Sequence, residues 1–447
     1  MNFIFEQYGE ACHLRQDRDT YLIKYLQVFY VITFIIVFLV TFFSNGTYDW
    51  GVIFWQLFSI VFWSISLKIG LMLKKNQMLL WVFLFQLILS FSLHFFFLYY
   101  TNDLLGYNAV DSVLYSDLAN KTKNLDFEGA LVEIGNTFSD LSDYGWPVFL
   151  KYIYWIGGDT LTSMRILILV NCIIQWFTTL LVYNLSVNIV NDTYKAHLIS
   201  LLWGLNLCST YLNVSGLKET LFTLLCTLSL FYIYKCKRKP YNHILFWVSI
   251  ASTYFFRPYM TFFFVIIYLG YCIFPYIYNR LFAWMCVAAI VLCLFFTSLL
   301  VYQFPEIYYA ILNTSENAPS GLGMYIYWLL AFLGPLPKFF NMETPQVLIM
   351  ITYTILKFSL SIFGLLSCIC FIKNKQTKYY PLISIYLFTV LLLIVSGHYV
   401  NYRYSYIIMP AFFILMVEGI QFRKKWIVEV YCICTSMIML IFNLKLY

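Results

Sequence analysis

Residues 78–100 read MLLWVFLFQLILSFSLHFFFLYY and contain no Asp, Glu, Lys or Arg. A helix needs about 20 predominantly apolar residues to cross the hydrocarbon core of a bilayer. Apolar runs of similar length recur along the chain and predict about 13 membrane-spanning helices, within a range of roughly 11–14. The candidate spans lie near residues 25–43, 51–73, 78–100, 163–188, 196–213, 217–234, 243–256, 259–277, 281–303, 346–372, 380–397, 405–421 and 426–444.

The composition of the whole chain agrees with these runs. Of its 447 residues, 62% are hydrophobic and only 11% are charged. Soluble proteins carry about 25% charged residues, and a single soluble core stops growing near 250–300 residues. The composition therefore excludes a water-soluble enzyme, a disordered protein and a nucleic-acid-binding protein. The predicted fold class is all-α: a polytopic transmembrane helical bundle that forms one membrane-embedded domain over residues 1–447.

The positions of Lys and Arg predict how the bundle is oriented. With a cytoplasmic N-terminus, most of the 28 Lys and Arg residues fall on the inner side, as the positive-inside rule requires. Residues 1–77 then hold two spans that precede the rest of the bundle. The apolar segment 322–340 is rich in Gly and Pro, so we expect it to be re-entrant or interfacial within an outer loop, 304–345. The richness in Tyr, Phe, Ile and Asn fits a bacterial inner-membrane protein.

The longest predicted outer loop, residues 101–162, concentrates acidic side chains. It holds nine of the 21 Asp and Glu residues of the chain. Spaced apolar residues within 117–138 predict a short amphipathic helix on the membrane surface. A second such helix is predicted over 146–156, with Pro147 near its start. The alternative is a solvated acidic loop without a catalytic role.

Cations at the ends of separate predicted spans share the outer side with this loop. Ionisable groups at membrane depth usually face the bundle interior or a water-filled cavity, although each one alone could also reach the headgroups. Guanidinium groups grip phosphate in a bidentate manner, so cations from several helices beside an acidic loop indicate a pocket for a phosphate ester. The residues concerned are Lys218, Arg257, His398 and Arg403.

Five motifs on this side, taken in order, resemble the GT-C superfamily of polytopic membrane glycosyltransferases. Each motif is short, but all five follow the order of the family along the chain. They are Asp111 with Tyr115 and Ala119 at helical spacing, Tyr144-Gly-Trp-Pro with Gly157-Gly158, Ser215-Gly-Leu-Lys-Glu219, Phe256-Arg-Pro-Tyr259, and Tyr402-Arg-Tyr404 followed by Pro410. Ser112 stands where the family often has Glu.

The resemblance implies transfer of a sugar from a polyprenyl-phosphate-linked donor to a lipid-linked or envelope glycan acceptor, with inversion. It implies Asp111 as the general base, with Asp117 as the nearest rival. The departing phosphate would be held by the four cations named above, and substrate hydroxyls would be positioned by Tyr115, Glu219 and Tyr259. No Asp-x-Asp pair or His-x-x-x-His spacing occurs in the acidic loop, so neither a metal nor another cofactor is predicted.

Two other functions remain open at this point. A polysaccharide repeat-unit polymerase of the O-antigen type would also be a multi-span inverting transferase with outer arginines. A lipid-linked glycan transporter or flippase would line its path with charged helix ends, although such proteins usually have internal repeats and helices broken near the midplane.

Overall fold

The computed structural model describes residues 50–105, 111–138, 143–236, 239–273, 351–395 and 402–421, together with a few positions between 426 and 437. Over these ranges the regular structure is helical and contains no strand. The all-α prediction is therefore confirmed. The predicted spans 25–43 and 281–303, the loop 304–345 and His398 lie outside the described residues.

The helices before the long gap in the description are α2 (Trp50–Met72), α3 (Lys75–Phe96) with its π-helical extension η1 (Phe97–Thr101), α4 (Asp111–Thr122), α5 (Phe127–Thr137), α6 (Gly145–Gly157), α7 (Thr160–Val190), α8 (Thr193–Gly204), α9 (Leu207–Val214), α10 (Glu219–Cys236), α11 (Tyr241–Tyr254), α12 (Pro258–Tyr268) and η3 (Leu269–Ile273). Those after the gap are α17 (Ile351–Lys373), η5 (Thr377–Tyr379), α18 (Tyr380–Val395), α19 (Tyr402–Tyr406) and α20 (Met409–Gln421).

Within the described residues, two helical segments are long and apolar enough to cross a membrane, namely Lys75–Tyr100 and Thr160–Val190. Shorter apolar helices lie at Leu57–Met72, Pro258–Cys272, Leu360–Lys373, Thr377–Leu392 and Met409–Ile420. The two long segments agree with the predicted spans 78–100 and 163–188. The total of about 13 spans stays a prediction.

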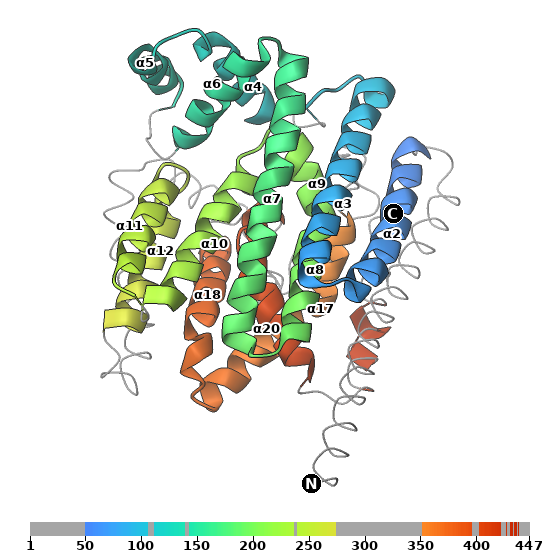
Figure 1. Ribbon diagram of the computed structural model, residues 1–447, viewed down its shortest axis with the longest axis vertical. Coiled ribbons are helices and arrows are strands. Elements are labelled where there is room, and N and C mark those ends of the chain that lie inside the picture. Colours follow the sequence, from blue (N-terminus) through green and yellow to red (C-terminus); the bar gives the residue numbers. More distant parts are fainter. Residues whose placement is uncertain are drawn as a thin grey trace, which may run out of the picture.

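The helix α7 is the central element of the bundle (Figure 1) and packs against α3, α6, α8, α9 and α10. Its first turn is capped by Asp159, whose carboxylate accepts a hydrogen bond of 2.9 Å from the amide of Thr162. Its last turn ends at Asn191, which adopts a left-handed conformation with φ of 57°. Asn tolerates that conformation better than most residues. The next residue, Asp192, caps the first turn of α8, so two adjacent polar residues end one helix and begin the next.

The single span predicted over 196–213 is wrong, because the structure breaks it into α8 and α9. The side chain of Asn206 accepts a hydrogen bond of 2.9 Å from the amide of Cys208 and so starts a new helix. On α3, Gln86 donates a hydrogen bond of 2.8 Å to the carbonyl oxygen of Gly204, which the break leaves free. Hydropathy alone predicted one continuous helix over these residues. The side chain of Asn206 instead competes with the helix for a backbone N–H donor.

The outer loop also differs from its prediction in one respect. The single helix predicted within 117–138 is two helices, α4 and α5, because Asp126 caps α5 with a hydrogen bond of 2.8 Å from the amide of Gly129. The helix predicted over 146–156 is present as α6, with Pro147 in its first turn. Figure 1 shows α4, α5 and α6 gathered at one end of the bundle, where α7 begins.

Candidate functional site

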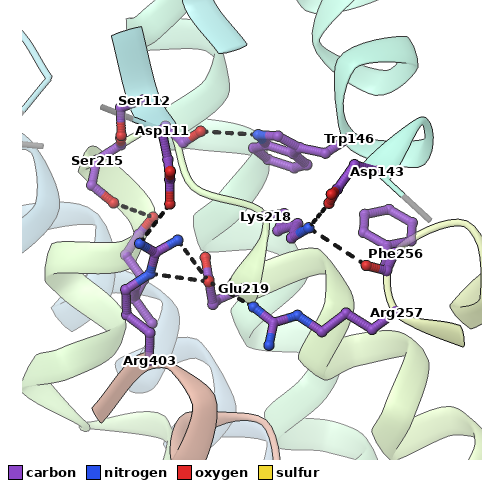
Figure 2. A network of polar contacts seen from close by, with 12 residues as sticks. Asp111, Ser112, Asp143, Trp146, Ser215, Lys218, Glu219, Phe256, Arg257 and Arg403 are labelled. Atoms are coloured by element: carbon purple, nitrogen blue, oxygen red, sulfur yellow. Dashed lines mark hydrogen bonds and ion pairs between the residues drawn. The ribbon is translucent and has the colours of Figure 1, made fainter. Parts of the chain in front are cut away.

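Charged residues from five segments that are distant in sequence meet at the end of the bundle that carries α4 and α6 (Figure 2). Asp111 is the first residue of α4, and Glu219 is the first residue of α10. Arg257 precedes Pro258 at the start of α12, and Arg403 lies on the short helix α19. The structure thus brings together predicted residues whose proximity the sequence did not specify.

Arg403 links two carboxylates at the centre of this network. Its Nη1 donates a hydrogen bond of 2.8 Å to Oδ2 of Asp111. Its Nε and Nη2 atoms both lie 3.1 Å from Oε1 of Glu219. Since a planar guanidinium group presents its donors in a fixed fork, these contacts define both the position and the orientation of the Arg403 side chain.

Glu219 is fully buried and also pairs with a second arginine. Its Oε1 atom lies 3.7 Å from Nη2 of Arg257, whose Nη1 donates a hydrogen bond of 2.7 Å to the hydroxyl of Tyr259. The other carboxylate oxygen, Oε2, is buried without a hydrogen-bond partner within the described part of the chain. A buried carboxylate is costly unless it is paired, so two guanidinium groups beside Glu219 account for its position.

Lys218 forms the second arm of the network. It makes an ion pair with Asp143, and its Nζ lies 3.5 Å from the carbonyl oxygen of Phe256. Asp143 is one of the acids of the outer loop for which the sequence predicted no individual role. Its place two residues before the Gly145-Trp146-Pro147 motif was the signal that could have drawn attention to it.

Backbone contacts hold the outer helices against the rest of the site. The hydroxyl of Ser112 donates to the carbonyl oxygen of Ser215, and Trp146 Nε1 donates to that of Gly216 at 2.9 Å. Gly216 has φ of 72°, a conformation that favours glycine. The starts of α4 and α6 are therefore both attached to the turn that leads into α10.

Gly145 allows one further close approach. Its amide donates a hydrogen bond of 3.0 Å to the carbonyl oxygen of Phe255. A Cβ atom at this position would lie 2.8 Å from Cε2 of Phe256 and 3.0 Å from the Phe255 carbonyl oxygen. The absence of a side chain at residue 145 thus lets the start of α6 lie against the turn between α11 and α12.

Exposure increases from the arginines to Asp111. The exposed fraction of the side chain is 0% for Glu219, 9% for Arg257, 16% for Arg403 and 43% for Asp111. Asp111 is therefore the accessible carboxylate of the central network, and the two arginines lie behind it. This arrangement can present one acid to a bound molecule while it holds fixed cations nearby.

Tyr115 lies one turn after Asp111 on α4 and is buried. Burial raises the pKa of its phenol well above the ordinary value, and the nearby charges of Asp143, Glu219 and Asp111 raise it further. The hydroxyl therefore stays protonated even at alkaline pH and can donate a hydrogen bond. Asp117 is exposed and takes no part in the network of Figure 2.

The network has no excess charge, since three carboxylates accompany three cations. A phosphate ester would therefore share the guanidinium groups with Glu219 and Asp111. Among the residues that the structure describes, no three His, Cys, Asp or Glu side chains are grouped so that they could hold a metal ion.

Comparisons of the chain with models of protein families, with curated proteins and with solved structures found no match. The resemblance to GT-C glycosyltransferases thus has only its motifs as support. Those motifs contribute Asp111, Tyr115, Lys218, Glu219, Arg257, Tyr259 and Arg403, all of which lie in or beside the network described above.

Proposed function

We propose that this protein is an inverting membrane glycosyltransferase that moves a sugar from a polyprenyl-phosphate-linked donor to a lipid-linked or envelope glycan acceptor. The observation that carries the proposal is the meeting of Asp111, Arg403, Glu219 and Arg257 from four distant segments. An ion pair that only stabilises the fold needs two partners. This network joins four charged residues, and one of them, Asp111, is accessible to a bound molecule.

In the proposed reaction, Asp111 takes the proton of the acceptor hydroxyl as that oxygen attacks the anomeric carbon. The bond from this carbon to the phosphate oxygen breaks on the opposite face, so the configuration inverts. Arg257, Arg403 and Lys218 stabilise the departing phosphate, because donors aimed at developing charge lower the barrier. Glu219 holds both guanidinium groups in place through its Oε1 atom, and the Tyr115 and Tyr259 hydroxyls bind substrate oxygens.

The proposal places the chain in a bacterial inner membrane with about 13 spans and a cytoplasmic N-terminus. The two long apolar helices support a membrane location. The network then lies on the extracytoplasmic side, where α4, α5 and α6 rest at the headgroup level. The exposed apolar residues Phe127 and Val132 on α5, and Trp155 on α6, suit that interface.

The test replaces each of the two candidate bases in turn. General-base catalysis contributes roughly 10²–10⁴-fold, so we expect Asp111→Asn to lower sugar transfer by about that factor. The matched control is Asp117→Asn, which makes the same chemical change on the same helix outside the network and is expected to retain transfer. Near-normal transfer by Asp111→Asn, or a loss confined to Asp117→Asn, would refute the assignment.

The fate of a labelled donor sugar separates the proposed function from its alternatives. A transferase yields a single new glycoside, whereas a repeat-unit polymerase yields a ladder of glycan lengths. Neither product forms if the protein only translocates its substrate. This assay therefore tests the reaction class independently of any single residue.

A transporter is the second candidate, because the structure contains a helix broken beside buried polar groups. Asn213 Nδ2 lies 3.3 Å from Oε1 of Gln86, and the hydroxyl of Thr220 lies 3.2 Å from Oδ1 of Asn213. Since Gln86 also donates to the carbonyl oxygen of Gly204, these contacts connect the break between α8 and α9 to the residue after Glu219. Transporters often bind substrates at such interrupted helices. Recovery of chemically unchanged lipid-linked glycan on the opposite leaflet would favour this candidate.

A further inference from the structure

Arg403, at the centre of the network, lies on a helix that is too short to hold its own shape. The helix α19 has five residues, and a single helical turn has little stability of its own. Its position therefore depends on contacts with the rest of the bundle, and it packs against α10 and α18. Its last residue, Tyr406, lies three positions after Arg403, so the two are neighbours on the surface of the helix.

The hydroxyl of Tyr406 contacts side chains from two other helices. Tyr406 is 0% exposed, and its hydroxyl donates a hydrogen bond of 3.3 Å to Oε1 of Gln175 on α7. The same hydroxyl lies 2.7 Å from Oγ of Ser209 on α9. Because a phenol has one proton and an amide oxygen can only accept, the Ser209 hydroxyl is the donor in the shorter contact. The Tyr406 hydroxyl thus both donates and accepts.

The break between α8 and α9 shapes the surroundings of Tyr406. The ring of Tyr406 lies 5.1 Å from that of Trp203 on α8, measured between centroids. On one continuous α-helix, residues six positions apart point about 120° away from each other. The break at Asn206 lets Trp203 and Ser209 contact the same side chain. Gln175 Nε2 lies 3.4 Å from the carbonyl oxygen of Trp203. We call Gln175, Trp203 and Ser209 the anchor group.

We propose that Tyr406, held by the anchor group, is a positioning residue that keeps the Arg403 guanidinium in the orientation that the departing phosphate requires. Arg403 reaches Asp111 at 2.8 Å and Glu219 at 3.1 Å. A rigid fork meets both partners only from a narrow range of backbone positions, and Tyr406 fixes the backbone of α19. The inference rests on the proposed function, because that function gives Arg403 its part in the reaction.

Tyr406→Phe is the decisive variant, because it keeps the ring beside Trp203 and removes only the hydroxyl. A displacement of about 1 Å can cost 10²-fold in rate, so we expect kcat per folded molecule to fall by roughly 10–100-fold. An interaction made in the transition state lowers kcat and kcat/KM by the same factor, and we expect that pattern. Ser209→Ala leaves the bond to Gln175 and is expected to lower kcat less. It provides the same test if Tyr406→Phe does not fold.

Tyr379→Phe is the matched control. Tyr379 is 2% exposed, and its hydroxyl donates a hydrogen bond of 3.2 Å to Glu418, which pairs with Lys195. The substitution therefore removes a hydroxyl from another buried contact, outside the network. We expect both tyrosine variants to lose stability and only Tyr406→Phe to lose kcat per folded molecule. An unchanged kcat in Tyr406→Phe would overturn the proposal.

A double-mutant cycle separates positioning from a general effect on the fold. Removal of one donor to developing charge costs about 10²–10³ in kcat, so we expect a loss of that size in Arg403→Met. If Tyr406 acts through Arg403, addition of Tyr406→Phe to Arg403→Met lowers kcat no further, because coupled residues are not additive. A structural role of Tyr406 predicts instead that the two losses multiply, and that result would also overturn the proposal.

The position of Arg403 can be measured without the reaction. The Arg403 side chain is 16% exposed, and the rate at which phenylglyoxal labels its guanidinium group is followed by mass spectrometry of the digested protein. We expect faster labelling in Tyr406→Phe, since a displaced guanidinium loses its two carboxylate partners, and the wild-type rate in Tyr379→Phe. Equal rates in the wild type and Tyr406→Phe would contradict the proposal. Faster labelling in Tyr406→Phe, with no sugar transfer by the wild type, would refute the proposed function and leave the anchoring of Arg403 intact.

Discussion

Glu219→Gln is the change that examines the central network most directly. The substitution preserves the size of the side chain but removes the charge that lies 3.1 Å from Arg403 and 3.7 Å from Arg257. Breaking a buried ion pair costs about 3–5 kcal/mol when one charge loses its partner. Arg403 keeps Asp111 and Arg257 keeps the Tyr259 hydroxyl, so we expect a loss of stability of about 3 kcal/mol, the lower end of that range.

The control for this prediction is Glu418→Gln, which breaks another largely buried ion pair. Glu418 lies 3.0 Å from Lys195 and accepts a hydrogen bond of 3.2 Å from the Tyr379 hydroxyl. Both variants are compared by the free energy of unfolding in a denaturing-detergent titration and by sugar transfer per folded molecule. We expect both to lose stability and only Glu219→Gln to lose transfer. Equal transfer per folded molecule in the two variants would show that Glu219 has no role beyond stability.

Two further predictions follow from contacts at the outer end. Gly145→Ala places a Cβ atom 2.8 Å from Phe256, so we expect a loss of about 1–3 kcal/mol of unfolding free energy. Unchanged stability of Gly145→Ala in the same denaturing-detergent titration would contradict the close approach. Because the pKa of Tyr115 is raised, its hydroxyl is expected to stay protonated as pH rises through the usual tyrosine range. Transfer by the wild type should then show no alkaline loss from this residue, while Tyr115→Phe should lower transfer at all pH values, and a Tyr115-dependent decline near pH 10 would contradict that reasoning.

The all-helical fold could be predicted from the sequence because long apolar runs leave few alternatives. The boundaries of α3 and α7 lie within a few residues of the predicted spans 78–100 and 163–188. The break at Asn206 could not be found in the same way, since residues 196–213 are apolar enough for one helix. One cause is local, since the Asn206 side chain caps α9. The other is distant, since the amide of Gln86 donates a hydrogen bond to the carbonyl oxygen of Gly204.

The candidate site was predictable in part for a similar reason. Motif order and topology placed Asp111, Glu219, Arg257 and Arg403 on one side of the predicted bundle, but neither specified which groups form pairs. Glu219 was expected to bind a substrate hydroxyl, and the structure places it between two arginines. Asp143 was missed as an individual residue, because its partner Lys218 is 75 positions away and no spacing rule connects them.

The length of α7 affects how a substrate can reach Asp111. Its 31 residues extend about 46 Å at 1.5 Å per residue, whereas the hydrocarbon layer is about 30 Å thick. A tilt of roughly 50° would be needed to contain the whole helix, which is beyond the usual range of 0–40°. Part of α7 therefore projects beyond the hydrocarbon layer. If that part includes its first turns, α6 and the start of α4 stand above the lipid tails, and the donor of the proposed reaction has to raise its sugar to that height on its prenyl chain.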